Sequence, residues 1–189
     1  MKREVDLSLA YRLIAPRPVV IITTVDSNGR INAAPFSLVC PVSFDPPRVM
    51  FCTDPEHDTY LNVKETKEFV INVPPADILD KVWETARDYP RGVNELEKAG
   101  LKWEPSLKVK PPRVVECVAH LECVYAWERE VGDHVMIVGD VVAAFVNEDC
   151  IDRSNVLDVR TAKPLLHVGR NVFVIGDKRI SAKITRSRG

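Results

Sequence analysis

The sequence has no long apolar run, no secretion signal and no excess of basic residues, and each absence excludes a class of protein. No segment approaches the roughly 20 apolar residues that span a bilayer, and no signal-peptide core follows the charged first residues. We therefore expect a cytoplasmic protein with no membrane partner. The formal net charge is -1 at pH 7. Nucleic-acid phosphates require a basic surface, so we expect no nucleic-acid partner.

The cysteines lack the spacing of a disulfide framework or a zinc site. There are five, an odd number, and no two of them form a Cys-x-x-Cys pair. We expect small buried thiols and no bound metal. Cys117 and Cys123 are separated by an even number of positions in a strand-like segment, which predicts that they share one face.

Most of the chain shows strand and hairpin patterns. Residues 19–25 are all β-branched, and Asn28-Gly29 after them is typical of a tight hairpin turn. In residues 115–127, apolar odd positions alternate with Glu116, His120 and Glu122, the period of a half-buried strand. Strands are predicted at residues 19–25, 31–37, 48–53, 68–73, 115–127, 134–146, 165–168 and 172–175.

Helical patterns are few and short. They predict an N-terminal helix at residues 7–14, a helix at 58–67 with Asp58 as its N-cap, and a helical insertion at 76–99. A tail follows at 177–189. We expect a single domain of mainly β structure, with antiparallel strands in a closed or partly closed barrel.

Residues 32–37 are an unusual strand. Their sequence is Asn-Ala-Ala-Pro-Phe-Ser, and the proline removes one donor from the strand ladder. The segment is therefore an edge strand, a β-bulge or a place where a ligand approaches. In the ligand interpretation, small side chains and backbone N–H groups face the polar edge of a flat ring.

The predicted helix start at residues 57–62 suits an anion. The free N–H groups and the dipole of a helix N-terminus favour negative charge. Thr59 can donate its hydroxyl to a phosphate, and His57 can add positive charge when protonated. The alternative is an ordinary surface helix capped by Asp58. The chain has no glycine-rich loop followed by lysine, so a Walker-type phosphate loop is excluded.

Several of these segments, in this order, resemble the flavin reductase-like family of FMN-binding split barrels, which includes the flavoredoxins. The likeness extends over most of the chain, from about residue 14 to 176. The segments that carry it are Pro16-Arg17-Pro18-Val19-Val20, Thr23-Thr24-Val25-Asp26, Asn28-Gly29-Arg30, Asn32-Ala33-Ala34-Pro35-Phe36-Ser37, Asp45-Pro46-Pro47, Asp58-Thr59, Asn62, Glu68-Phe69-Val70-Ile71-Asn72, Gly132-Asp133-His134, Gly139-Asp140-Val141-Val142 and Pro164-Leu165.

The resemblance implies a Greek-key split β-barrel that forms a homodimer, with FMN near the subunit interface. It also implies that His134 lies near the ring or a nicotinamide pocket. The ring would be lined by Asn32, Ala33, Ala34, Pro35, Phe36 and Ser37, and the ribityl chain and phosphate would be reached by Cys52, Thr53, His57, Asp58, Thr59 and Asn62.

His57 is a departure from the family, because many relatives carry Lys or Arg directly before the Asp-Thr pair. A neutral imidazole would compensate less phosphate charge, so FMN retention is expected to weaken as the pH rises. An FMN dissociation constant independent of pH between about 5.5 and 8 would contradict this, because that window brackets the usual histidine pKa.

The leading functional hypothesis is an oxidoreductase in which NADH or NADPH transfers hydride to N5 of FMN. The electrons would pass to a protein, a free flavin or another acceptor. A flavoredoxin-like carrier without nicotinamide activity is the first alternative. A flavin-free barrel that serves as a binding module is the second. Hydrolase motifs such as Gly-x-Ser-x-Gly are absent.

Overall fold

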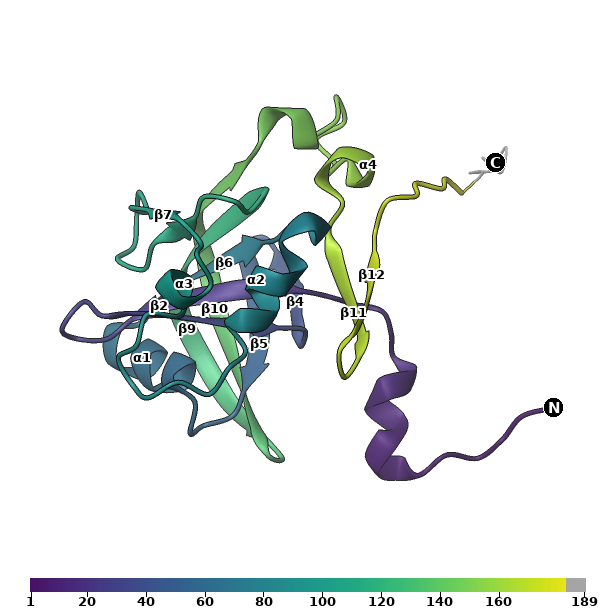
Figure 1. The fold of residues 1–189 in the computed structure, drawn as a ribbon, viewed down its shortest axis with the longest axis horizontal. Helices are drawn as coiled ribbons and strands as arrows, with labels where there is room; N and C mark the ends of the chain where they lie inside the picture. Colours follow the sequence, from purple (N-terminus) through teal and green to yellow (C-terminus); the bar gives the residue numbers. More distant parts are fainter. Residues whose placement is uncertain (183–189) are drawn as a thin grey trace.

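The computed structural model describes residues 1–182 and shows a mainly β molecule with short helices (Figure 1). The mainly β prediction is therefore confirmed. The strands are β1 (Arg17–Pro18), β2 (Val20–Val25), β3 (Ile31–Phe36), β4 (Val39–Phe44), β5 (Pro47–Thr53), β6 (Glu68–Val73), β7 (Trp103–Glu104), β8 (Arg113–Val114), β9 (Ala119–Val131), β10 (His134–Val146), β11 (Leu165–Gly169) and β12 (Val172–Ile175). The helical segments are η1 (Leu7–Leu13), α1 (Asp58–Thr66), η2 (Ala76–Ile78), α2 (Leu79–Glu84), α3 (Glu95–Lys98), η3 (Glu148–Cys150) and α4 (Val159–Ala162).

Seven strands form one antiparallel sheet in the order β3-β2-β6-β9-β10-β5-β4. Its two ends, β3 and β4, do not pair with each other, so the sheet keeps two free edges. A second sheet contains β1, β11 and β12, and β7 pairs with β8. The predicted hairpins β2–β3 and β9–β10 are present. β4 was not predicted, because Pro41 within it weakens the strand signal.

β2 is buried along its whole length because apolar groups cover both of its faces. Ile22 packs in one cluster with Phe51 and Phe69, whereas Ile21 packs in a second cluster with Leu96. A strand that is buried on both faces is expected to be a continuous apolar run rather than an alternating one. The β-branched sequence of residues 19–25 therefore reflects a central position in the sheet.

The helices lie close to their predicted positions. Two differences concern the type of η1 and the N-cap of α1. η1 is a 3-10 helix with no buried residue, and it projects from the body of the molecule as an arm (Figure 1). Asp58 is the first residue of α1 and not its N-cap; the N-cap is His57, whose side chain makes no capping hydrogen bond. The Asp58 cap prediction is therefore wrong.

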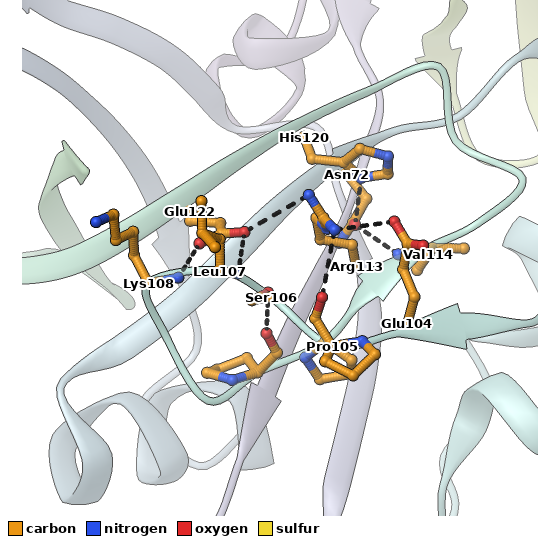
Figure 2. Close-up of polar contacts among 12 residues, drawn as sticks. Asn72, Glu104, Pro105, Ser106, Leu107, Lys108, Arg113, Val114, His120 and Glu122 are labelled. Atoms are coloured by element: carbon orange, nitrogen blue, oxygen red, sulfur yellow. Dashed lines mark hydrogen bonds and ion pairs between the residues drawn. The ribbon is translucent and has the colours of Figure 1, made fainter. Parts of the chain in front are cut away.

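β9 begins at Ala119 rather than at residue 115, and its polar face is buried. His120 and Glu122 are only 7% and 0% exposed, because the segment that includes β7 and β8 covers them (Figure 2). Glu122 accepts hydrogen bonds from the backbone N–H groups of Leu107 at 2.8 Å and Lys108 at 2.6 Å. The half-buried strand prediction is therefore wrong for this face.

The cysteine predictions hold only in part. Cys117, Cys123 and Cys150 are buried, but Cys40 is exposed and Cys52 is half-buried. Cys117 lies before β9 and packs in a different apolar cluster from Cys123, so the two do not share a strand face.

The described part of the chain contains no helix that is both long and apolar enough to cross a membrane. Of the predicted tail, residues 177–182 have no regular secondary structure, and residues 183–189 lie outside the described residues.

Candidate functional site

A cavity of about 750 Å³ opens where β3 and β5 end and α1 begins. Its other walls are residues 85–89 after α2, Glu95 of α3, and His134 at the start of β10. Pockets that bind small molecules usually measure about 300–1,000 Å³. The cavity therefore has room for a ligand of mononucleotide size.

The cavity gathers every predicted site residue except Asn62. Four separate parts of the chain supply them, and they meet only because the sheet brings the ends of β3, β5 and β10 together. They are Asn32, Ala33, Ala34, Pro35, Phe36 and Ser37 from β3 and its end, Cys52 and Thr53 from β5, His57, Asp58 and Thr59 from the start of α1, and His134 from β10.

Asn62 lies behind the cavity wall in a buried polar network. Its side-chain amide donates to Thr24 Oγ1 over 3.1 Å and accepts from Arg91 Nη2 over 3.1 Å. Asn32 donates to the same Thr24 hydroxyl over 3.1 Å and to Thr59 Oγ1 over 3.0 Å. Asn62 therefore supports the wall from behind, while Asn32 and Thr59 join the strand to the helix.

β3 is an edge strand, which settles how Pro35 is accommodated. Its register with β2 is continuous over its whole length, so the β-bulge alternative is wrong. The N–H of Ala33 donates outward to Glu95 Oε2 over 2.8 Å. Backbone N–H directions alternate along a strand. The backbone nitrogen of Pro35 therefore points away from β2, as that of Ala33 does, and its missing N–H breaks no hydrogen bond between the two strands. Ala33 N–H is occupied, so fewer free N–H groups line this edge than predicted.

The first turn of α1 is open toward the cavity. His57 at the N-cap lines the cavity without capping the helix. The carboxylate of Asp58 is held by an ion pair with Arg91. The free N–H groups of this turn, together with the helix dipole, form a place for an anion.

Ser37 connects the cavity to a second polar group. Its hydroxyl lies 3.2 Å from His167 Nδ1, and Arg17 Nη2 lies 3.3 Å from the same nitrogen. His167 Nε2 lies 3.0 Å from the carbonyl oxygen of Arg170, so Nε2 carries the proton and Nδ1 accepts. Ser37 and Arg17 therefore both donate toward Nδ1, and the Ser37 oxygen also accepts from Arg17 Nε over 3.5 Å.

Two groups in the cavity wall have shifted pKa values. Burial raises the pKa of Glu95; the N–H of Ala33 opposes this, and the charge of Asp58 adds to it. Burial also raises the pKa of Cys52, with a further contribution from Cys40. The Cys52 thiol is therefore protonated near neutral pH, which makes it a poor nucleophile.

Sequence reasoning missed the contribution of the helical insertion. The segment after α2 and the first residue of α3 line the cavity, but the helical pattern revealed only the apolar stripe that faces the core. Glu95 follows the N-cap Asn94, where acidic residues are common in any helix, so no local signal marks it as a cavity residue. The missed lining residues are Leu38, Asp54, Glu56, Thr85, Ala86, Arg87, Asp88, Tyr89 and Glu95.

A family model described as "Flavin reductase like domain" matches residues 11–176. The chain belongs to the flavin reductase-like family. A protein of Methanothermobacter thermautotrophicus is 39% identical to this flavin reductase-like chain over 160 residues, which cover 82% of the chain and 76% of that protein.

Solved structures share the fold of this flavin reductase-like protein. A structure from Shewanella frigidimarina, described as having a split barrel domain, is similar with a TM-score of 0.86 and 19% identity over 96% of this chain and 94% of that one. Flavoredoxin of Desulfovibrio vulgaris (Miyazaki F) is similar with a TM-score of 0.82 and 18% identity over 100% and 98%. The split-barrel prediction is confirmed.

Proposed function

We propose that the cavity holds FMN and that the protein is a flavin-dependent oxidoreductase that takes electrons from NADH or NADPH. One observation carries this proposal: a single cavity collects all but Asn62 of the residues that the family resemblance assigns to the ring, the ribityl chain and the phosphate. Membership of the flavin reductase-like family supports it.

The residues of the cavity fit FMN in size, shape and charge. Ala34 and Pro35 on the edge strand are small enough for a flat ring to approach the backbone. The open first turn of α1 suits a phosphate, and the imidazole of His57 stands beside it. Thr53 and Thr59 add hydroxyl groups to the cavity lining.

Bound FMN would supply the redox chemistry, with hydride arriving at N5 from the reduced nicotinamide and electrons leaving to a protein, a free flavin or another acceptor. The protein orients the reactants. His134 lines the cavity from the start of β10, and its imidazole is held by Asp133 over 2.8 Å. We propose that it borders the place where the nicotinamide stacks.

The test is spectroscopic. Purified protein mixed with FMN should show bound-flavin absorbance, and anaerobic addition of NADH or NADPH should bleach it. Tight FMN binding with no bleaching by either nucleotide would replace the reductase with a flavoredoxin-like electron carrier. A protein that shows no flavin and gains none on mixing would overturn the proposal and leave the flavin-free binding module.

We also propose that the protein is a homodimer. The N-terminal arm exposes Leu7, Leu13 and Ile14 by 88%, 69% and 76%, and Phe44 on the edge strand β4 is 92% exposed. Large apolar side chains exposed to this extent are a feature of interaction surfaces. A second copy is the partner that the family resemblance implies. Light scattering should give twice the monomer mass, and Leu13→Asp should shift it toward the monomer.

A further inference from the structure

Glu95 is a buried carboxylate in which one oxygen, Oε1, lacks a hydrogen-bond partner from another residue of the described chain. The residue is 6% exposed, and its Oε2 is fixed by the N–H of Ala33 at 2.8 Å. The backbone N–H of Glu95 itself is the second donor that acts on the carboxylate. Glu95 lines the cavity, so a ligand in the cavity lies next to this carboxylate.

No cation compensates this carboxylate. Within residues 1–182, no Lys, Arg or His forms an ion pair with Glu95. Arg87, which lines the cavity, pairs with Glu84, and Arg91, which lies outside the lining, pairs with Asp58. The charged group that acts on Glu95 is the like-charged Asp58. A buried carboxylate of this kind requires hydrogen-bond donors.

The position of Glu95 indicates which part of the ligand lies next to it and can supply those hydrogen-bond donors. Glu95 touches Ala33 of β3, on the side proposed for the ring, and it interacts with Asp58 at the start of α1, on the side proposed for the phosphate. The stretch of FMN between ring and phosphate is a chain of hydroxyl groups. Hydroxyls can donate to a carboxylate, whereas a phosphate would be repelled by it.

We propose that Glu95 binds the ribityl hydroxyls of the flavin through its carboxylate. This inference rests on the proposed function, because it assumes that the cavity holds FMN. It makes the helical insertion part of the binding site, with α3 contributing the contact to the polyol chain and β3 the contact to the ring.

The experiment compares three ligands in one variant. Riboflavin lacks the phosphate, and lumiflavin lacks both the phosphate and the hydroxyl chain. Glu95→Gln should weaken FMN and riboflavin by about tenfold or more, the range for losing hydrogen bonds to a charged group. It should change the lumiflavin dissociation constant by less than about twofold. Glu97→Gln, on the exposed side of α3, is the matched control and should change none of the three.

Two results would overturn the inference. In the first, Glu95→Gln leaves riboflavin binding unchanged. In the second, it weakens lumiflavin as much as riboflavin, which would mean that Glu95 acts only by holding the edge of β3. Circular dichroism and thermal unfolding of the variant identify any general loss of structure. If the wild-type protein binds none of the three flavins, the proposed function itself fails, and that outcome is distinct from the other two.

Discussion

Asn32 Nδ2 donates a hydrogen bond to Thr59 Oγ1 over 3.0 Å, and both side chains are almost completely buried. The bond joins β3, which carries the proposed ring contacts, to α1, which carries the proposed phosphate contacts. Thr59→Val removes the acceptor and leaves a buried amide hydrogen without that partner. We expect it to lower the free energy of unfolding by about 1–2 kcal/mol and to weaken FMN binding.

Thr59→Ser is the control for this prediction, because it keeps the hydroxyl. Urea denaturation and FMN titration of both variants measure the two effects. A double-mutant cycle with Asn32→Ala should give a coupling energy of about 0.5–1.5 kcal/mol. A coupling energy of zero would show that the bond does not connect strand and helix energetically.

His57→Lys should tighten FMN binding most strongly in alkaline solution. His57 lines the cavity beside the open turn of α1. A lysine keeps its charge throughout the neutral range, whereas an imidazole carries a charge only while it is protonated. The ratio of wild-type to variant dissociation constants should therefore rise between about pH 5.5 and 8. A ratio that stays constant across this range would remove His57 from the phosphate site.

Glu122→Gln should be strongly destabilising. The carboxylate of Glu122 is fully buried and accepts two backbone N–H groups, and Arg113 Nη1 lies 3.9 Å away (Figure 2). An amide accepts through one oxygen only, so one N–H meets an NH2 group instead. We expect a loss of about 3 kcal/mol in unfolding free energy.

Glu104→Gln is the matched control for Glu122. Glu104 pairs with the same arginine at 3.1 Å, but its side chain is 50% exposed. Exposed pairs contribute little, so denaturation should detect a change below about 1 kcal/mol. Similar losses in the two variants would mean that burial of Glu122 is not what sets its contribution.

The protein should lose stability in mild acid because of His120. Burial, followed by the charge of Arg113, lowers the pKa of His120 below 6.5. The unfolded chain therefore binds a proton at higher pH than the folded chain does. The free energy of unfolding should be at its full value above about pH 6.5 and should fall as the pH drops from there to the folded-state pKa.

Denaturation curves at several pH values measure this effect. The variant His120→Asn should show a smaller change of unfolding free energy with pH, whatever the stability of the variant at neutral pH. An NMR titration of the His120 imidazole with a midpoint at or above 6.5 would contradict the prediction.

Local patterns were sufficient for much of the fold. The β-branched run that became β2 and the Asn28-Gly29 turn lie where the sequence predicts them, and the long hairpin of β9 and β10 is present although β9 begins four residues later than predicted. Hairpins depend on neighbouring residues, so their signals are local. β4 was missed because it is an edge strand that contains a proline.

By itself, the sequence determined that the protein is mainly β, and it identified residues 32–37 and the start of segment 57–62, which share the cavity. Only the tertiary structure decided what faces them. It buried His120 and Glu122 under the segment that includes β7 and β8, and it placed Asn62 outside the cavity lining. It also brought Glu95 across 62 positions to the N–H of Ala33. A residue pattern records what a segment needs to bury, but it does not record which remote segment covers it.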